Sequence, residues 1–136
     1  MKKSDSILAV APTLDDLVIG SDELEDADLA AALHGRVGLV KERLSVRLLG
    51  AAANDGAKKR LIAAGLARHA MRRKGWLDEG DLSAAVEWFA NQIQQKPKSV
   101  TEELSRLKKL GLMDRDQRGW HVPTWALRQA IVFLGE

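Results

Sequence analysis

Cysteine and tyrosine are absent from this chain of 136 residues, and proline occurs only three times. Without cysteine, the protein cannot form disulfides, use a thiol nucleophile or bind a metal through thiolates. No apolar run approaches the roughly 18 residues of a transmembrane helix, so we expect no contact with a membrane. The apolar segment over residues 7–11 is too short for a secretory signal, and we expect a cytoplasmic protein.

Motifs of enzymes and metal sites are lacking as well. The three histidines, His34, His69 and His121, belong to different segments and do not form the His-x-x-x-His spacing of a metal-binding helix. The sequence has no Gly-x-Ser-x-Gly nucleophile motif and no glycine-rich phosphate loop. It therefore predicts a protein with no catalytic residues, no metal ligands and no cofactor.

Acidic and basic side chains are distributed unevenly, although the net charge of the whole chain is only +2. Residues 1–30 carry a net charge of −6, residues 31–75 carry +9, and residues 76–136 carry −1. The first segment also has no sustained apolar period, so we predict an acidic, mobile arm over residues 1–25. Residues 26–136 are predicted to form a single, mainly α-helical domain.

Apolar side chains at helical spacing predict two helices within the basic segment. The second helix covers residues 57–74. The first helix covers residues 28–48, and steps of three or four residues separate the members of its apolar stripe. These members are Leu29, Leu33, Val37, Val40, Leu44 and Leu48.

Two more helices are predicted on either side of a proline. Residues 83–94 have one apolar face and predict a third helix, which Pro97 separates from the fourth. Ser99 and Glu102 have the spacing of a capping box, which predicts that the fourth helix starts at Ser99. This helix is predicted to run to residue 110.

The C-terminal part predicts a hairpin and a last helix. Residues 112–122 indicate two short strands joined by a turn, and Thr124 is placed to cap the helix that follows. This helix is apolar on more than one side. It is therefore either enclosed within the monomer or part of a homodimer contact, and we favour the homodimer. The tryptophans, which we interpret as core residues, are Trp76, Trp88, Trp120 and Trp125.

The order of helix, short turn, helix, glycine and hairpin resembles a winged helix-turn-helix over about residues 82–122. Ala90 matches the small residue at which two helices of that family cross. The spacing of MarR-like and cyclic-AMP-receptor-like regulators is repeated by Val100, Leu104, Leu107, Gly111 and Leu112. The family often has glycine in the turn, where this chain has Gln94 or Gln95, so we expect a turn built around Pro97.

The resemblance implies that the fourth helix enters the major groove of double-stranded DNA and that the hairpin contacts the flanking backbone or the minor groove. The helical period predicts a buried side formed by Val100, Leu104, Leu107 and Leu110. The candidate DNA-binding residues are Lys98, Ser99, Thr101, Glu102, Ser105, Arg106, Lys109, Arg115 and Arg118. Arg106 is the best candidate for contacting a guanine or a phosphate, and we also expect His121 to reach the backbone.

A denser basic cluster lies outside this unit, and it is interpreted either as a solvated helix surface or as an auxiliary electrostatic surface. Its members are Arg36, Arg43, Arg47, Lys58, Lys59, Arg60, Arg68, Arg72, Arg73 and Lys74. The candidates for the auxiliary surface are Arg36, Arg43, Arg47, Arg72, Arg73 and Lys74. Its partner is either nucleic acid or the acidic arm, which would fold back or come from a second subunit. A folded-back arm would act as a brake on DNA binding. A protein partner for the arm is the other interpretation.

The sequence thus predicts a small regulator of transcription or of a mobile element, which binds specific DNA sites and has no catalytic activity. The alternative is a winged-helix adaptor that assembles a larger replication, partition or defence complex. Winged helices also bind proteins, and residues 76–136 are nearly neutral. A third interpretation is a subunit that binds nucleic acid without sequence preference through residues 31–75.

Overall fold

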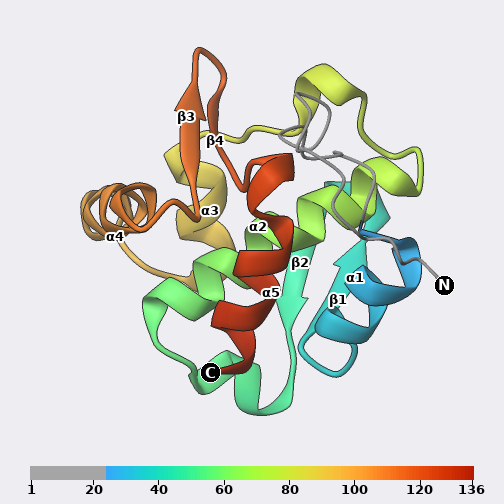
Figure 1. Ribbon diagram of the computed structural model, residues 1–136. Helices are drawn as coiled ribbons and strands as arrows, with labels where there is room; N and C mark the ends of the chain where they lie inside the picture. The colour runs from blue at the N-terminus through green and yellow to red at the C-terminus, as the bar shows by residue number, and fades with distance from the viewer. Residues whose placement is uncertain (1–23) are drawn as a thin grey trace, which may run out of the picture.

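A long helix at the centre of the molecule organises the fold. The computed structural model describes residues 24–136, and helix α2 (Ala57–Arg73) runs between the other elements (Figure 1). Every residue from Leu61 to His69 is buried. A helix that is enclosed on all sides supplies the core for its neighbours. The prediction of a helix over residues 57–74 is confirmed.

The segment before α2 differs from its prediction. It forms helix α1 (Asp26–Leu33), strand β1 (Val37–Val40), a 3-10 turn (Lys41–Arg43) and strand β2 (Ser45–Leu48). The two strands pair in antiparallel register. A single helix over residues 28–48 is therefore wrong. Gly35 has a φ of 77° and Leu44 a φ of 48°, and these left-handed residues end the helix and close the hairpin.

Two helices and a second hairpin follow α2. They are α3 (Val86–Ile93), α4 (Pro97–Lys109), β3 (Asp114–Asp116) and β4 (Gly119–His121). Ala84, just before α3, pairs with Trp120 through backbone hydrogen bonds of 2.8 and 2.9 Å. A Cβ atom on Gly119 would lie 2.2 Å from the carbonyl oxygen of Ala84, so this pairing requires glycine there. The predicted helix pair and hairpin are confirmed in order and position.

Helix α4 begins earlier than its predicted start. Lys96 is its N-cap residue, and Pro97 occupies the first helical position, where a missing N–H group costs nothing. Ser99 lies inside the first turn, so the predicted capping box of Ser99 and Glu102 is wrong. The hydroxyl of Thr101 donates to the carbonyl oxygen of Pro97 at 3.0 Å, which further orders this first turn.

Gln94, rather than Pro97, makes the turn between α3 and α4. It follows the last residue of α3 and has a φ of 56°, in the left-handed region that glycine adopts most easily. The expectation of a turn built around Pro97 is therefore wrong. A glutamine occupies the position at which glycine would be least strained.

Replacing Gln94 by glycine should raise the free energy of unfolding by about 0.5–1 kcal/mol. The left-handed conformation costs an L-residue roughly 1–2 kcal/mol, and glycine avoids this cost. Glycine also makes the unfolded chain more flexible, which offsets part of the stabilisation. Urea denaturation measures the change. Gln95→Gly is the matched control and should give no gain, because Gln95 lies outside the left-handed region. A less stable Gln94→Gly protein would contradict this account of the turn.

The C-terminal segment forms a 3-10 turn (Thr124–Ala126) and helix α5 (Leu127–Gly135). Thr124 is the first residue of the turn and makes no capping hydrogen bond, so its predicted capping role is wrong. Helix α5 packs against α2 and α1 and buries Leu127, Ala130 and Leu134. One side of this helix is therefore enclosed within the monomer, while Val132 on another side is 64 % exposed.

The four tryptophans differ in burial. Trp120 is 4 % exposed, Trp76 and Trp88 are half-buried, and Trp125 is 53 % exposed. The prediction that all four are core residues is therefore wrong for Trp125. This residue lies in the turn before α5, at the surface of the protein.

The predicted acidic arm over residues 1–25 lies almost entirely outside the described residues. Leu24, at its end, is buried with 5 % exposure and belongs to the main hydrophobic core. No helix within residues 24–136 is long and apolar enough to cross a membrane.

Candidate functional site

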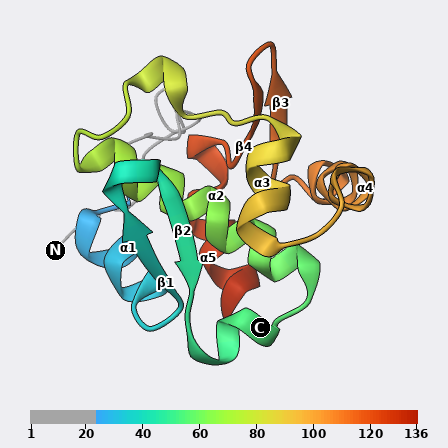
Figure 2. The ribbon, with the colours of Figure 1, turned by 180° about the vertical axis from the view of Figure 1, so that it is seen from behind.

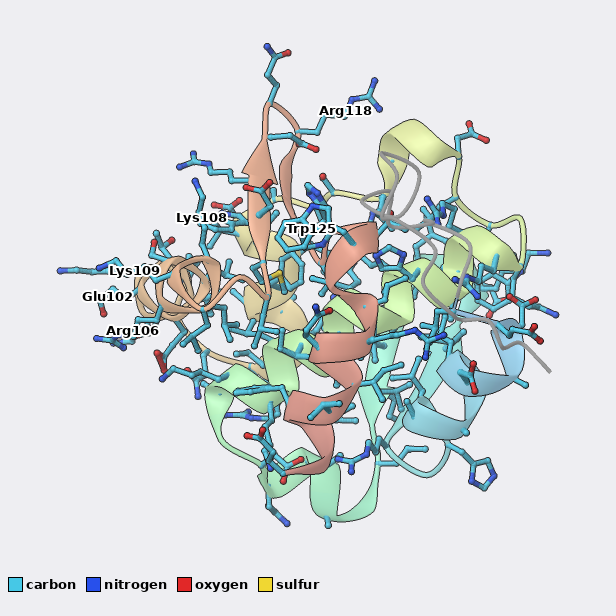
Figure 3. The ribbon with its side chains drawn as sticks, in the orientation of Figure 1. Glu102, Arg106, Lys108, Lys109, Arg118 and Trp125 are labelled. Atoms are coloured by element: carbon cyan, nitrogen blue, oxygen red, sulfur yellow. The ribbon has the colours of Figure 1, made fainter. Side chains whose placement is uncertain are left out.

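Helix α4 has one buried and one exposed side. Val100, Leu104 and Leu107 are wholly buried, at 0 % exposure. All the residues predicted to face a partner from this helix are exposed: Lys98, Ser99, Thr101, Glu102, Ser105, Arg106 and Lys109. Figure 3 shows Glu102, Arg106 and Lys109 pointing away from the body of the protein. The helical period therefore predicted the buried and the exposed side of α4 correctly, with Leu110 just after the helix as the exception.

Leu110 is 60 % exposed, although it was predicted to be buried. Helix α4 ends at Lys109, and Leu110 is its C-cap residue, so the chain turns before Leu110 can reach the core. Lys108 is a further exposed basic residue of α4 that the sequence prediction missed. The helical period could have identified it, because only three residues of α4 are buried and Lys108 lies outside that apolar stripe.

The charge of the exposed side is predominantly positive. Residues 96–110 contain five basic side chains and two acidic ones. One of the acids, Glu103, accepts hydrogen bonds from Arg106 at 2.7 Å and from Lys58 at 3.2 Å. These contacts, mainly the hydrogen bond from Arg106, lower the pKa of Glu103 and keep it ionised. Glu103 is thus neutralised within the protein, which leaves Glu102 as the acidic group facing solvent.

The hairpin of β3 and β4 holds its arginines differently from the prediction. Arg118 is exposed, but its guanidinium donates to the carbonyl oxygen of Gly80 and, at 3.2 Å, to the carboxylate of Asp81 (Figure 3). Arg115 is also exposed, and its guanidinium lies over the ring of Trp120 at 5.6 Å. Arg118 therefore connects the hairpin to the loop before α3, whereas the guanidinium of Arg115 has the ring of Trp120 as its contact and is the more available of the two for a partner.

Ser83, Asp116 and His121 form a polar cluster that the sequence prediction missed. The Ser83 hydroxyl donates to Asp116 at 2.6 Å and lies 2.9 Å from Nδ1 of His121. The hydrogen bond from Ser83 is the main cause of a lowered pKa for Asp116. In a nucleophilic triad the serine and the carboxylate engage opposite nitrogens of the imidazole, whereas Ser83 and Asp116 both approach Nδ1 of His121 and are bonded to each other. These contacts connect the loop before α3 to the hairpin.

His121 was expected to reach a nucleic-acid backbone, and the structure places it elsewhere. Its side chain is 18 % exposed and is turned toward Ser83 and Asp116, with Nδ1 3.6 Å from the Asp116 carboxylate. No sequence signal identified this cluster, because its members lie more than 30 positions apart in pairs such as Ser83 and Asp116.

The predicted auxiliary basic surface is divided by the fold. Arg36 lies 3.8 Å from Asp55, and Arg73 donates to the carbonyl oxygen of Leu24 at 2.8 Å and to Asp26 at 2.9 Å. These two arginines are paired. Within the described chain, no ion pair is formed by Arg43, Arg47, Arg72 or Lys74. Arg43 and Arg47 belong to the β1–β2 hairpin, Arg36 lies between α1 and β1, and the other three residues lie at the C-terminal end of α2. A role of these residues as an auxiliary surface stays a prediction.

Arg68 has a structural role that charge counting did not reveal. Only 7 % of it is exposed, and its guanidinium donates to the carbonyl oxygens of Leu82 at 2.8 Å and Asp81 at 2.6 Å. It also lies over the ring of Trp88 at 4.6 Å. Burial lowers its pKa, with the nearby Asp81 acting in the opposite direction. Arg68 thereby fixes the loop that leads to Ala84.

Among residues 24–136, no group of three or more His, Asp or Glu side chains is placed to hold a metal ion. No family model matches the chain, and no curated protein or solved structure matches it either.

Proposed function

We propose that residues 82–122 form a winged helix-turn-helix unit and that the protein binds double-stranded DNA through α4. The order of elements supports this proposal, with α3 and α4 joined by a short turn and followed by a hairpin. The pairing of Ala84 with Trp120 adds a third extended segment to β3 and β4, as expected for the small sheet of such a unit.

The exposed, basic side of α4 carries the proposal. Helix α4 has 13 residues, which corresponds to a length of about 20 Å at the usual helical rise. The major groove of DNA is wide enough to admit an α-helix. Lys98 and Ser99 at the N-terminal end are placed for phosphates or base edges. Arg106 would exchange Glu103 for a guanine or a phosphate, since an arginine fork suits both.

The regulator of transcription or of a mobile element remains the function that fits this geometry best. Binding as a homodimer belongs to the same proposal, because a two-fold dimer suits palindromic sites. The exposed Trp125 and Val132, at 53 % and 64 %, offer apolar area for such a contact at the C-terminal helix.

The double variant Lys98→Gln/Lys109→Gln tests the role of α4. Each phosphate contact releases a counterion, so the plot of log affinity against log salt should become less steep by about 1.8 when two contacts are lost. Fluorescence anisotropy of a labelled genomic duplex between about 50 and 200 mM salt measures this slope.

The matched control is Lys41→Gln/Arg128→Gln, which removes the same charge from exposed positions outside α4 and outside the auxiliary basic surface. It should leave the slope close to that of the unmodified protein. Arg106→Ala should in addition reduce the preference for one fragment over others by roughly 5- to 150-fold, as loss of a base contact worth about 1–3 kcal/mol does. If the α4 variant and the control behave alike, DNA binding through α4 is refuted.

A protein-binding adaptor is the second candidate, and the exposed apolar side chains of Leu110, Trp125 and Val132 favour it. Single exposed apolar residues are common on soluble proteins, so this observation is weaker than the basic face of α4. An adaptor should bind no genomic duplex at physiological salt, in unmodified or variant form.

A further inference from the structure

A basic groove lies between the β1–β2 hairpin and α3, apart from the exposed side of α4. Its volume is about 890 Å³, and three arginines line it: Arg43, Arg47 and Arg60. Among the residues that the structure describes, no Asp or Glu lines this groove. Such a concentration of one charge, without an internal counterion, favours binding of an anion.

Arg60 lines the inner part of the groove and has no acidic partner among the described residues. One of its terminal nitrogens donates to the carbonyl oxygen of Ile93 at 2.9 Å. Its Nε is buried and has no acceptor within residues 24–136. A guanidinium has five N–H donors and a permanent charge, and here a single carbonyl oxygen is its recorded acceptor. Arg43 and Arg47 at the rim are exposed and form no ion pair with any other described residue.

The two walls of the groove are fixed to each other by side-chain hydrogen bonds. The Gln92 side chain accepts from the backbone N–H of Val46 at 2.8 Å and donates to the carbonyl oxygen of Trp88 at 3.0 Å. The indole N–H of Trp88 donates to the carbonyl oxygen of Leu44 at 2.9 Å. The arginines of the hairpin are therefore held at a set position relative to α3, which reduces the entropy lost when a ligand binds.

The groove adjoins the turn that leads into α4. Gln94 lines the groove, and Lys96 and Lys98 follow it as exposed residues at the start of α4. In Figure 2, α3 lies between β2 and α4, and it contacts both of them. A strand of polyanion that passes the N-terminal end of α4 thus has a basic path into the groove.

We propose that this groove binds the phosphodiester backbone of the DNA duplex that α4 engages, an inference that rests on the proposed function. Arg43 and Arg47 would each contact a phosphate through the guanidinium fork. The side chains of Asn91 and Gln94, which also line the groove, supply neutral N–H donors to phosphate oxygens. The contact carries no sequence information and adds affinity and register.

The test is the double variant Arg43→Gln/Arg47→Gln, with the same genomic duplexes and salt series as for α4. Loss of two phosphate contacts should make the slope of log affinity against log salt less steep by about 1.8 and weaken binding at least about tenfold near 0.1 M salt. The choice among fragments should stay the same, because no base contact is removed. Arg43→Lys/Arg47→Lys should keep most of the slope, since lysine also displaces counterions.

Lys41→Gln/Arg128→Gln is again the matched control, because neither residue lines the groove and the net charge changes equally. Thermal unfolding checks that each variant is folded. If the groove variant matches the control while Lys98→Gln/Lys109→Gln loses affinity, the groove proposal is overturned and DNA binding through α4 stands. If the unmodified protein binds no duplex, both proposals are overturned.

Discussion

Replacing Arg68 by methionine should lower the free energy of unfolding by about 3–4 kcal/mol. Methionine matches the length of the arginine stem but donates no hydrogen bond. The carbonyl oxygens of Asp81 and Leu82, which accept from Arg68 at 2.6 and 2.8 Å, would lose their charged donor in a buried setting. Each unsatisfied buried acceptor costs roughly 1–3 kcal/mol, and the stacking on Trp88 is lost as well.

Urea denaturation with a constant slope of free energy against urea measures this loss. Arg72→Met is the matched control on the same helix. Arg72 is half-buried and its side chain makes no hydrogen bond within residues 24–136, so we expect a change within about 0.5 kcal/mol. Arg68→Lys should fall between the two, because lysine keeps the charge and loses the fork. A loss below about 1 kcal/mol for Arg68→Met would show that the loop is held by other contacts.

The stability of the fold should decrease by about 3 kcal/mol as the pH falls from about 6.5 to about 4, owing to His69. His69 is wholly buried, and its Nε2 lies 2.6 Å from the carbonyl oxygen of Val122. Burial lowers its pKa to about 4, and the positive charges of Arg72 and Arg73 act in the same direction. Its other ring nitrogen, Nδ1, is buried without a partner among the described residues.

The direction of this effect follows from proton binding. In the unfolded chain the imidazole has its ordinary pKa of 6.5, so the unfolded state binds the proton more readily than the folded state does. The stabilisation is therefore complete above about pH 6.5 and is lost progressively as the pH falls toward about 4. Below that range both states are protonated and this contribution no longer changes.

His69→Gln isolates the contribution, because its amide can still donate to Val122 and does not titrate. Most of the pH dependence between about 6.5 and about 4.5 should disappear in this variant, measured by urea denaturation at successive pH values. His34→Gln, at an exposed position, is the control and should leave the dependence in place. An unchanged dependence in His69→Gln would assign the effect to the carboxylates instead.

The helices after residue 56 could be predicted from the sequence because their local signals agree with their surroundings. In α4, the apolar period, the proline at the first position and the glycine after the end all indicate the same helix. The segment over residues 28–48 gave a false helical period. Val37 and Leu48 face each other on two paired strands, and Leu29 and Leu33 lie on a separate helix, so the steps of four residues arise from three different elements.

The candidate site divides in the same way. Exposure of the α4 face depends on the period of one helix and was predicted residue by residue. The partners of Arg118, His121 and Arg73 depend on contacts between residues 37–49 positions apart, which no local pattern encodes. The groove beside α3 was equally hidden, because it exists only once residues 37–48 form a hairpin.

The burial of α2 over residues 61–69 also determines how the protein can come apart. Helix α1, the β1–β2 hairpin and helices α3, α4 and α5 all complete their cores on this one helix. If any of these elements detached, apolar side chains of α2 that also pack against the other elements would become exposed to water. We therefore expect the described chain to unfold as a single cooperative unit, with local opening confined to loops and termini and without separate folding of the proposed DNA-binding elements.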